Sequence, residues 1–255
     1  MPNNEELFDI VSDIHLSHKN IWLPPENHKE GLILAGDIFE FDAQLEMGIR
    51  YLKLLSTFYE CIIYVPGNHE FYTDNEERPI YFLELIVQER LNNEVPNVHL
   101  LLDDVFVYKH YTFVGSTYYT HISHPKSICP NSDFYKIYTD FGFILTFESM
   151  NELHDECKGK LIENLKSIKD DDTLVVVVTH FNPGITSSKT KHRDDEQWIA
   201  CDSKPIFETK LVNKWVYGHT HTYTRYKNEE YNIEFISNPK GYISEKTGFK
   251  DNTCI

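Results

Sequence analysis

Short polar motifs that directly follow apolar runs contain the residues of this chain best suited to chemistry. The motifs are Asp13-Ile14-His15, Gly36-Asp37, Gly67-Asn68-His69-Glu70, Thr179-His180 and Gly218-His219-Thr220-His221. In an extended backbone, residues i and i+2 face the same side, so Asp13 and His15 can point at one centre, as can His219 and His221. If the apolar runs are neighbouring strands of an α/β sheet, the motifs lie at its carboxyl edge, where such sheets bind ligands.

Each motif also has an ordinary explanation when it is considered alone. Asp13 and His15 could belong to a surface turn, and Asp37 could cap a helix. Together, however, the motifs supply two Asp, one Asn and at least four His, which is about twice the four ligands of one structural zinc. No cysteine is among them, and carboxylate, amide and imidazole donors suit manganese, iron or zinc. The sequence therefore predicts two divalent metal ions, and a pair about 3.5–4 Å apart can promote in-line displacement at phosphorus.

The apolar runs that must position these motifs are typical of buried strands. They cover residues 7–12, 31–35, 61–65, 174–178 and 212–217. The helical spacing of apolar residues predicts helices over 44–59, 79–91 and 148–168, and further short strands are expected at 98–102, 105–108, 111–115 and 231–236. Strand, helix and strand over 31–65 predict a right-handed unit with parallel strands, and hence an α/β fold.

Composition limits the classes of function. The chain has 255 residues and no linker rich in Ser, Gly or Pro, so one domain over residues 1–255 is expected. Its net charge of −16 disfavours general attraction to nucleic acid or to anionic membranes. Five scattered cysteines without a C-x-x-C pair, no signal peptide and no membrane-spanning run favour reduced thiols in a cytoplasmic protein.

Two segments have more than one interpretation. The aromatic-rich stretch from Tyr118 to Phe147 could form a wall over the site and stack a base, or it could only pack in the core. The polar loop from Phe181 to Lys204 is long for a compact domain, which is typical of a lid, a binding loop or a disordered segment. It contains the basic residues Lys189, Lys191, His192 and Arg193. This cluster could select a substrate through a distal anionic group, or it could be solvated.

In their order along the chain, the polar motifs resemble those of the calcineurin-like metallophosphoesterases over about residues 7–242. The resemblance implies a four-layer α/β/β/α sandwich of two mixed sheets with a dinuclear metal site at strand ends. It implies that Asp13, His15 and His221 hold one metal ion and that Asn68, His180 and His219 hold the other. Asp37 would bridge the two ions. His69 would act as general acid or stabilise the transition state, with Glu70 orienting it.

The chain departs from the family pattern at one position. The family often has G-D-x-x-D, and Glu40 stands at the last position here, which affects the surroundings of the site and not its metal ligands. The arginine pattern of the protein Ser/Thr phosphatase branch is missing after Glu70. The segment Asn238-Pro239-Lys240-Gly241-Tyr242 resembles the Asn-Pro-Arg-Gly-Tyr ending of a bacterial and phage-like branch.

The resemblance implies hydrolysis of a small phosphodiester or nucleotide-type phosphate ester by a hydroxide that bridges two metal ions. Two alternatives remain at this point. The chain could be a non-catalytic metal-binding scaffold of the same fold, or it could be a nuclease with a local basic groove. The sequence does not specify the oligomeric state, the native metals or the natural substrate.

Overall fold

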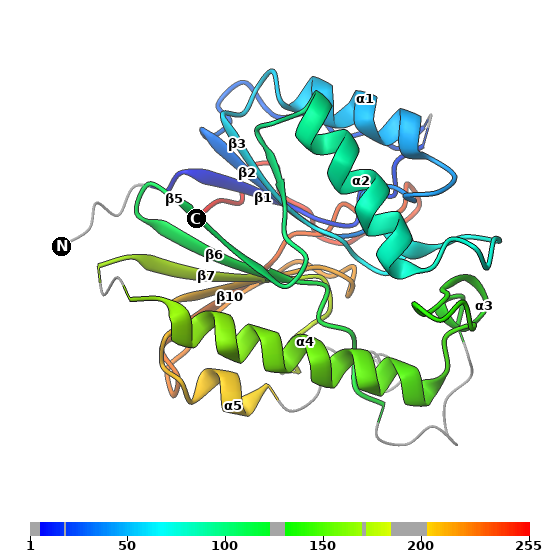
Figure 1. The fold of residues 1–255 in the computed structure, drawn as a ribbon. Coiled ribbons are helices and arrows are strands. Elements are labelled where there is room, and N and C mark those ends of the chain that lie inside the picture. Colours follow the sequence, from blue (N-terminus) through cyan, green and yellow to red (C-terminus); the bar gives the residue numbers. More distant parts are fainter. Residues whose placement is uncertain (1–5, 18, 123–130, 170–171, 185–202) are drawn as a thin grey trace.

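The computed structural model describes residues 6–17, 19–122, 131–169, 172–184 and 203–255 (Figure 1). A first sheet has the strand order β1-β2-β3-β4, and all its neighbouring strands are parallel. Its strands are β1 (Phe8–Val11), β2 (Gly31–Ala35), β3 (Cys61–Val65) and β4 (Val98–Leu100). The end of the chain runs antiparallel beside β1, because the Phe8 N–H donates to the Ile255 carbonyl at 3.0 Å and the Ile255 N–H donates back at 2.9 Å.

A second sheet has the strand order β5-β6-β7-β8-β10-β9. Its strands are β5 (Asp104–Tyr108), β6 (Tyr111–Ser116), β7 (Leu174–Thr179), β8 (Lys214–Tyr217), β9 (Thr224–Asn228) and β10 (Ile233–Ser237). The inner strands are parallel, and the two edge strands β5 and β9 pair antiparallel with their neighbours. This sheet is therefore mixed, as expected, whereas the first sheet is mixed only through the pairing of β1 with the chain end.

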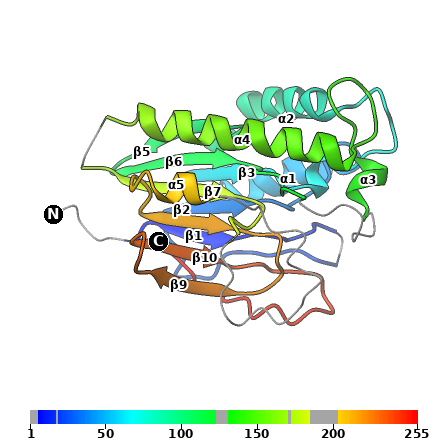
Figure 2. The same cartoon turned by 90° about the horizontal axis from the view of Figure 1, so that it is seen from below.

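Helices cover the outer face of each sheet. The longer ones are α1 (Leu45–Leu55), α2 (Ile80–Glu94) and α4 (Phe147–Ser167). Two short helices, α3 (Asp133–Lys136) and α5 (Lys204–Phe207), and a 3₁₀ turn at His69–Phe71 complete the set among the described residues. Figure 1 shows α1 and α2 outside the first sheet and α4 and α5 outside the second, and Figure 2 shows the same layers from below. The predicted α/β/β/α sandwich is confirmed.

The layers follow from the alternation of side chains along the strands. Ile33 and Ile63 of the first sheet pack with Val176 of the second in a core between the two sheets. Their neighbours in sequence, such as Leu34 and Val177, belong to the core under the helices. Because both faces of these strands are buried, the strands consist of apolar runs and not of alternating apolar and polar residues.

The aromatic-rich stretch and the long polar loop are only partly described by the structure. In the aromatic-rich stretch, Ile137 is buried, whereas Phe141 and Phe143 are 86% and 72% exposed. The described part of this stretch therefore contributes both to packing and to the surface. The expected basic cluster of the long loop, with Lys189, Lys191, His192 and Arg193, lies outside the described residues. Within the described chain, no helix has the length and apolar character needed to cross a membrane.

Candidate metal centre

All the predicted site residues gather at the carboxyl ends of five strands. Asp13 and His15 follow β1, Asp37 follows β2, the Asn68-His69-Glu70 motif follows β3, His180 follows β7, and His219 and His221 follow β8. Several of them have a left-handed backbone with φ between 45° and 66°, namely Asp13, His15, Asp37, His219 and His221. Such φ values are uncommon for residues other than glycine, and strained conformations of this kind cluster at functional sites.

The first donor cluster consists of Asp13, His15 and His221, whose ligand atoms all lie within 4.8 Å of one another. His221 Nε2 is 3.3 Å from Asp13 Oδ1 and 3.1 Å from His15 Nε2. The other ring nitrogen of His221 lies 2.6 Å from Glu245 Oε2. We assign the proton of this contact to Nδ1, because a carboxylate accepts hydrogen bonds, and this leaves Nε2 free to bind a cation.

The second donor cluster consists of Asp37, His180 and His219. His180 Nε2 lies 3.3 Å from Asp37 Oδ1, 3.2 Å from His219 Nδ1 and 3.0 Å from Asn68 Oδ1. The Ala35 carbonyl, 3.0 Å from His180 Nδ1, accepts the proton on that nitrogen. The remaining His180 nitrogen therefore faces the cluster, and its lone pair becomes available to a cation once its proton has left.

Asp37 joins the two clusters. Its Oδ1 faces His180, and its Oδ2 lies 3.8 Å from His15 Nε2 and 3.9 Å from His69 Nε2. The donors therefore form two adjacent sets of oxygen and imidazole nitrogen that share one carboxylate. This donor chemistry fits two borderline divalent ions such as manganese, iron or zinc.

Two glycines allow the strand ends to approach each other this closely. A Cβ atom on Gly67 would meet the Asp37 carboxylate and would lie 2.8 Å from the Asp37 backbone nitrogen. On Gly218 it would lie 2.6 Å from the Ala35 carbonyl oxygen and 2.9 Å from Asp13 Oδ2. Glycine therefore precedes the donors because any side chain there would displace a carboxylate of the site.

The buried carboxylates of the site stabilise positive charge in the second cluster. Burial opposes protonation of His180, but the carboxylates of Asp37 and Asp13 outweigh it and raise the pKa of His180 to about 10. Burial and the charge on His180 lower the pKa of His219 to about 3. In the metal-free chain, His180 therefore carries the proton that a bound cation would replace. Metal binding at such a site releases protons.

Glu70 forms hydrogen bonds with the backbone around Asp37. Its carboxylate accepts hydrogen bonds from the backbone N–H groups of Asp37, Ile38 and Gly67 at 2.9, 2.7 and 2.8 Å, and from the Tyr64 hydroxyl at 2.7 Å. Burial and the nearby Asp37 carboxylate raise the pKa of Glu70 to about 7. Glu70 thus holds the backbone that presents Asp37. The hydrogen bonds of its carboxylate among the described residues do not include the His69 ring, and the orientation of His69 by Glu70 stays a prediction.

Tyr72 and Asp133 position the Asn68-His69 motif, and sequence reasoning missed both. The Tyr72 ring packs on His69 with centroids 4.3 Å apart, and its hydroxyl donates to Asp133 at 2.6 Å. The same carboxylate accepts the Asn68 amide N–H at 2.8 Å, which turns the Asn68 oxygen toward His180. Asp133 is fully buried. Its position as the first residue of the four-residue helix α3, after the polar residues Asn131 and Ser132, gives no sequence signal for this function.

Tyr242 and Glu245 approach the first cluster from the chain's last segment. Tyr242 stacks on His15 with ring centroids 4.2 Å apart, and Glu245 bonds to His221. The Asn238–Tyr242 segment, noted only as a family resemblance, is therefore part of the site. A cavity of about 340 Å³ opens beside the clusters. It is lined by His15, Leu16, Ser17, Asp37, Phe39, Glu40, Gln44, His69 and Tyr242.

Comparisons with known proteins agree with this geometry. The chain is 27% identical to the uncharacterized protein L509 of Acanthamoeba polyphaga mimivirus, in a match that covers 96% of this chain and 94% of that protein. Its fold is similar to that of the phosphopantetheinyl hydrolase PptH from Mycobacterium tuberculosis, with a TM-score of 0.66, 19% identity and coverage of 92% and 89% of the two chains. The family model of the calcineurin-like phosphoesterases matches residues 6–223. The chain therefore belongs to the calcineurin-like phosphoesterase family.

Proposed function

We propose that this chain is a dinuclear metal-dependent hydrolase of small phosphate esters, either phosphodiesters or nucleotide-type esters. The observation that carries the proposal is the pair of donor clusters that share the Asp37 carboxylate. Asp13, His15 and His221 would hold one ion, and Asn68, His180 and His219 the other. Two divalent ions held there would supply an activated water and neutralise negative charge that develops on the phosphoryl oxygens.

His69 is the proposed general acid. Its ring lies between His15 and Tyr72, and its side chain is 25% exposed, so it can reach a ligand in the adjacent cavity. Its backbone N–H donates to Asp37 Oδ1 at 3.0 Å, which ties the acid to the bridging carboxylate. A proton on Nε2 could be given to the leaving oxygen once an ester is bound.

The cavity supports a small substrate. Its volume of about 340 Å³ is near the lower end for ligand sites, which span about 300–1,000 Å³. Tyr242 offers aromatic surface, whereas Glu40 places a carboxylate on the lining. An extended polyanion such as a nucleic acid strand would meet this carboxylate. The geometry therefore favours a compact ester over a nuclease substrate.

The test measures turnover and metal content together. Protein purified without chelator should contain up to two transition-metal ions per chain and should release nitrophenol from mono- or bis-nitrophenyl phosphate when manganese is added. A panel of nucleotides and phosphodiesters then ranks natural-like substrates. Bound metal without turnover would favour the non-catalytic scaffold, and cleavage of single-stranded DNA in preference to small esters would favour the nuclease. Absence of metal after incubation with excess manganese would refute the proposal.

A cytoplasmic location remains part of the proposal. The described cysteines Cys61, Cys157 and Cys254 are all free and buried, which fits a compartment where thiols stay reduced. Burial raises the pKa of Cys61 and Cys157 to about 12, so both thiols are unreactive near neutral pH.

A further inference from the structure

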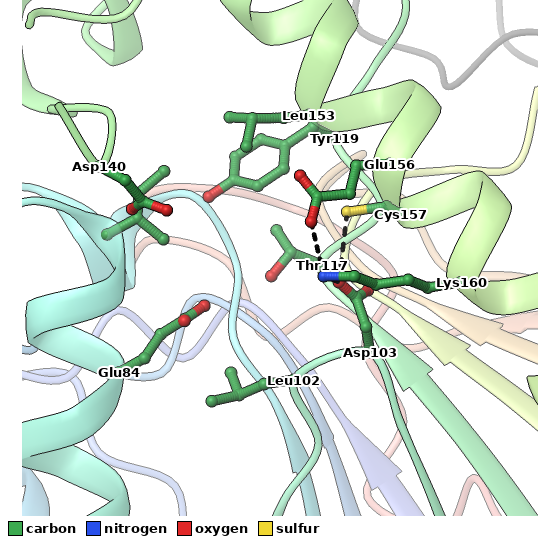
Figure 3. A pocket seen from close by; sticks show the side chains of 11 residues that line it. Glu84, Leu102, Asp103, Thr117, Tyr119, Asp140, Leu153, Glu156, Cys157 and Lys160 are labelled. Carbon is green, nitrogen blue, oxygen red and sulfur yellow. Dashed lines mark hydrogen bonds and ion pairs between the residues drawn. The ribbon is translucent and has the colours of Figure 1, made fainter.

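A second cavity lies between α2 and α4 and shares no residue with the donor clusters. Its volume is about 120 Å³, several times the space that one water molecule needs. Glu84 comes from α2, Asp103 follows β4, Tyr119 follows β6, and Glu156 and Lys160 come from α4. Asp140 completes the polar part of the lining, and Figure 3 shows these side chains around a common space.

The cavity carries an excess of negative charge. Lys160 is its only basic lining residue, and it is already paired with Glu156 at 2.7 Å and with Asp103 at 3.4 Å. No lysine or arginine within the described ranges forms an ion pair with Glu84 or Asp140. Burial, together with the charges on Asp103 and Asp140, raises the pKa of Glu84 to about 8. The charge on Lys160 lowers the pKa of Glu84 but does not offset these effects, and the backbone N–H of Tyr81 donates to Asp140 Oδ1 at 3.1 Å. Among the described residues, neither carboxylate thus has an ion-pair partner.

An unpaired hydroxyl points to a ligand in the same space. Tyr119 is 97% buried, and its hydroxyl has no hydrogen-bond partner among the described residues. Asp103 Oδ1 is likewise buried without a partner. Figure 3 shows the Tyr119 hydroxyl directed from its ring toward the side of the cavity that Glu84 and Asp140 line. Buried polar groups of folded proteins are almost always hydrogen-bonded, so these atoms require a partner. Water alone would satisfy the hydroxyl but would supply no positive charge to stabilise ionised Glu84.

The spacing of the carboxylates favours an organic cation over a metal ion. A bound Ca²⁺ or Mg²⁺ keeps its oxygen ligands at about 2.0–2.6 Å, which places these oxygens within about 5 Å of one another. Among the described residues, groups with this spacing occur only at the metal centre and not in this cavity. Leu102 and Leu153 also line the space and offer apolar contact for a methylene chain. An ammonium group on a short alkyl chain matches both features, because its hydrogen bonds reach further than metal–oxygen bonds.

We propose that this cavity binds a small aliphatic amine in its protonated form. The ammonium group donates hydrogen bonds to Glu84, Asp140 and the Tyr119 oxygen, and the methylene chain contacts Leu102 and Leu153. The Tyr119 hydroxyl can donate its own proton to a neighbouring carboxylate while it accepts from the ammonium group. The site does not depend on the metal centre, so binding should persist in protein stripped of metal.

The experiment titrates metal-free protein with butylamine and, separately, with 1-butanol, magnesium chloride and calcium chloride. Ligand-observed NMR or isothermal titration supplies the dissociation constant. We expect saturable binding of butylamine at one site per chain and no comparable binding of the neutral alcohol. Glu84→Gln and Asp140→Asn should each weaken butylamine binding at least tenfold, and Tyr119→Phe at least threefold. Asp140 is exposed, so its variant should keep the fold even if a core variant does not.

Glu89→Gln is the matched control, since Glu89 is an exposed residue on the same helix that does not line the cavity. It should leave the dissociation constant unchanged. The proposal is overturned if butylamine shows no saturable binding or if butanol binds equally well. It is also overturned if calcium or magnesium binds there in place of the amine, or if Asp140→Asn and Glu84→Gln bind butylamine as tightly as the parent chain.

Discussion

Asp37 and His69 are neighbours in space whose replacement should have different consequences. Asp37→Asn removes the charge that both donor clusters share, and we expect loss of activity together with weaker binding of both metal ions. His69→Asn removes the proposed proton donor but no proposed ligand. It should keep its metal content while turnover falls by about 10²–10⁴-fold, the usual scale of general acid–base catalysis. Metal analysis and nitrophenyl phosphate kinetics on the same preparations separate the two roles.

The metal content of the His69→Asn variant decides whether His69 is a proton donor or a metal ligand. If His69→Asn loses metal to the same extent as Asp37→Asn, His69 is a ligand and the assignment of a general acid is wrong. His15, Asp37 and His69 form a third group whose ligand atoms lie within 4.8 Å of one another, so the structure alone also allows His69 to be a metal ligand. Metal content distinguishes these functions, and activity alone does not.

Glu245 should tune the first metal site without contacting an ion itself. Its carboxylate fixes the His221 ring through the 2.6 Å contact with Nδ1. Removal of such an outer partner of a metal-binding histidine typically costs 10–100-fold in affinity, roughly, and we expect this loss for one of the two ions in Glu245→Gln. Competition with a chelator measures it. Glu229→Gln, an exposed substitution in the turn that follows the edge strand β9, is the control and should bind both ions normally.

The site was predictable from the sequence only where its residues directly follow strands. Asp13, Asp37 and His180 have this position, and parallel strands bring such positions to one edge. Asp133 and Glu245 act across the fold, 65 residues from Asn68 and 24 from His221. No local pattern encodes such contacts, since they depend on how a distant segment folds back over the sheet edge.

At the scale of elements, the cavity between α2 and α4 should make stability depend on pH. Glu84 has a pKa of about 8 in the folded chain and 4.5 as its ordinary value, so the folded chain holds more protons between these pH values. The contribution of Glu84 to the free energy of unfolding must therefore fall as the pH rises from about 4.5 to about 8. Glu84→Gln removes this penalty. We expect the variant to be more stable than the parent by about 1–3 kcal/mol at pH 8.5, less than the full linkage value because Glu84 is partly exposed.

Urea unfolding at pH 3.5, 7 and 8.5 measures this difference. The two proteins should be nearly equal at pH 3.5, where Glu84 is mostly protonated in both the folded and the unfolded chain, and should diverge as the pH rises. A constant difference across the series would show that folding does not shift the pKa of Glu84. The experiment is run without added amine, since a bound cation would lower the pKa of Glu84.

The elements that carried strong sequence patterns were predicted, and the weak ones were not. Cys61–Val65 and Leu174–Thr179 are apolar runs, and the helix predicted over 148–168 matches α4 within one residue at each end. Strand β9 was missed because Thr224–Asn228 is polar and lies at a sheet edge, where only part of each side chain is buried. The helices α3 and α5 have four residues each, too few to show helical periodicity.

At the scale of the whole molecule, the end of the chain is part of the core. Ile255 is 1% exposed and packs between the two sheets, beside Phe8 and Ile10 of β1. We therefore propose that residues 1–255 form one domain. Ile255→Ala should cost about 2–4 kcal/mol, as expected for truncation of a buried aliphatic side chain. Ile243→Ala, at a position 67% exposed, should change stability by less than about 0.5 kcal/mol. Equal effects in denaturant unfolding would contradict this packing.

The donors of the first cluster come from opposite parts of the chain, because His15 and His221 are 206 positions apart in the sequence. On a ribosome that adds about 5–20 residues per second, His15 would emerge roughly 10–40 s before its partner. During that interval the nascent chain holds only part of the proposed ligand set. If the proposed site takes up its ions as the chain is completed, we expect the ions bound to follow the cellular supply of transition metals during translation. Protein refolded in a defined metal and protein made in cells should accordingly differ in metal composition.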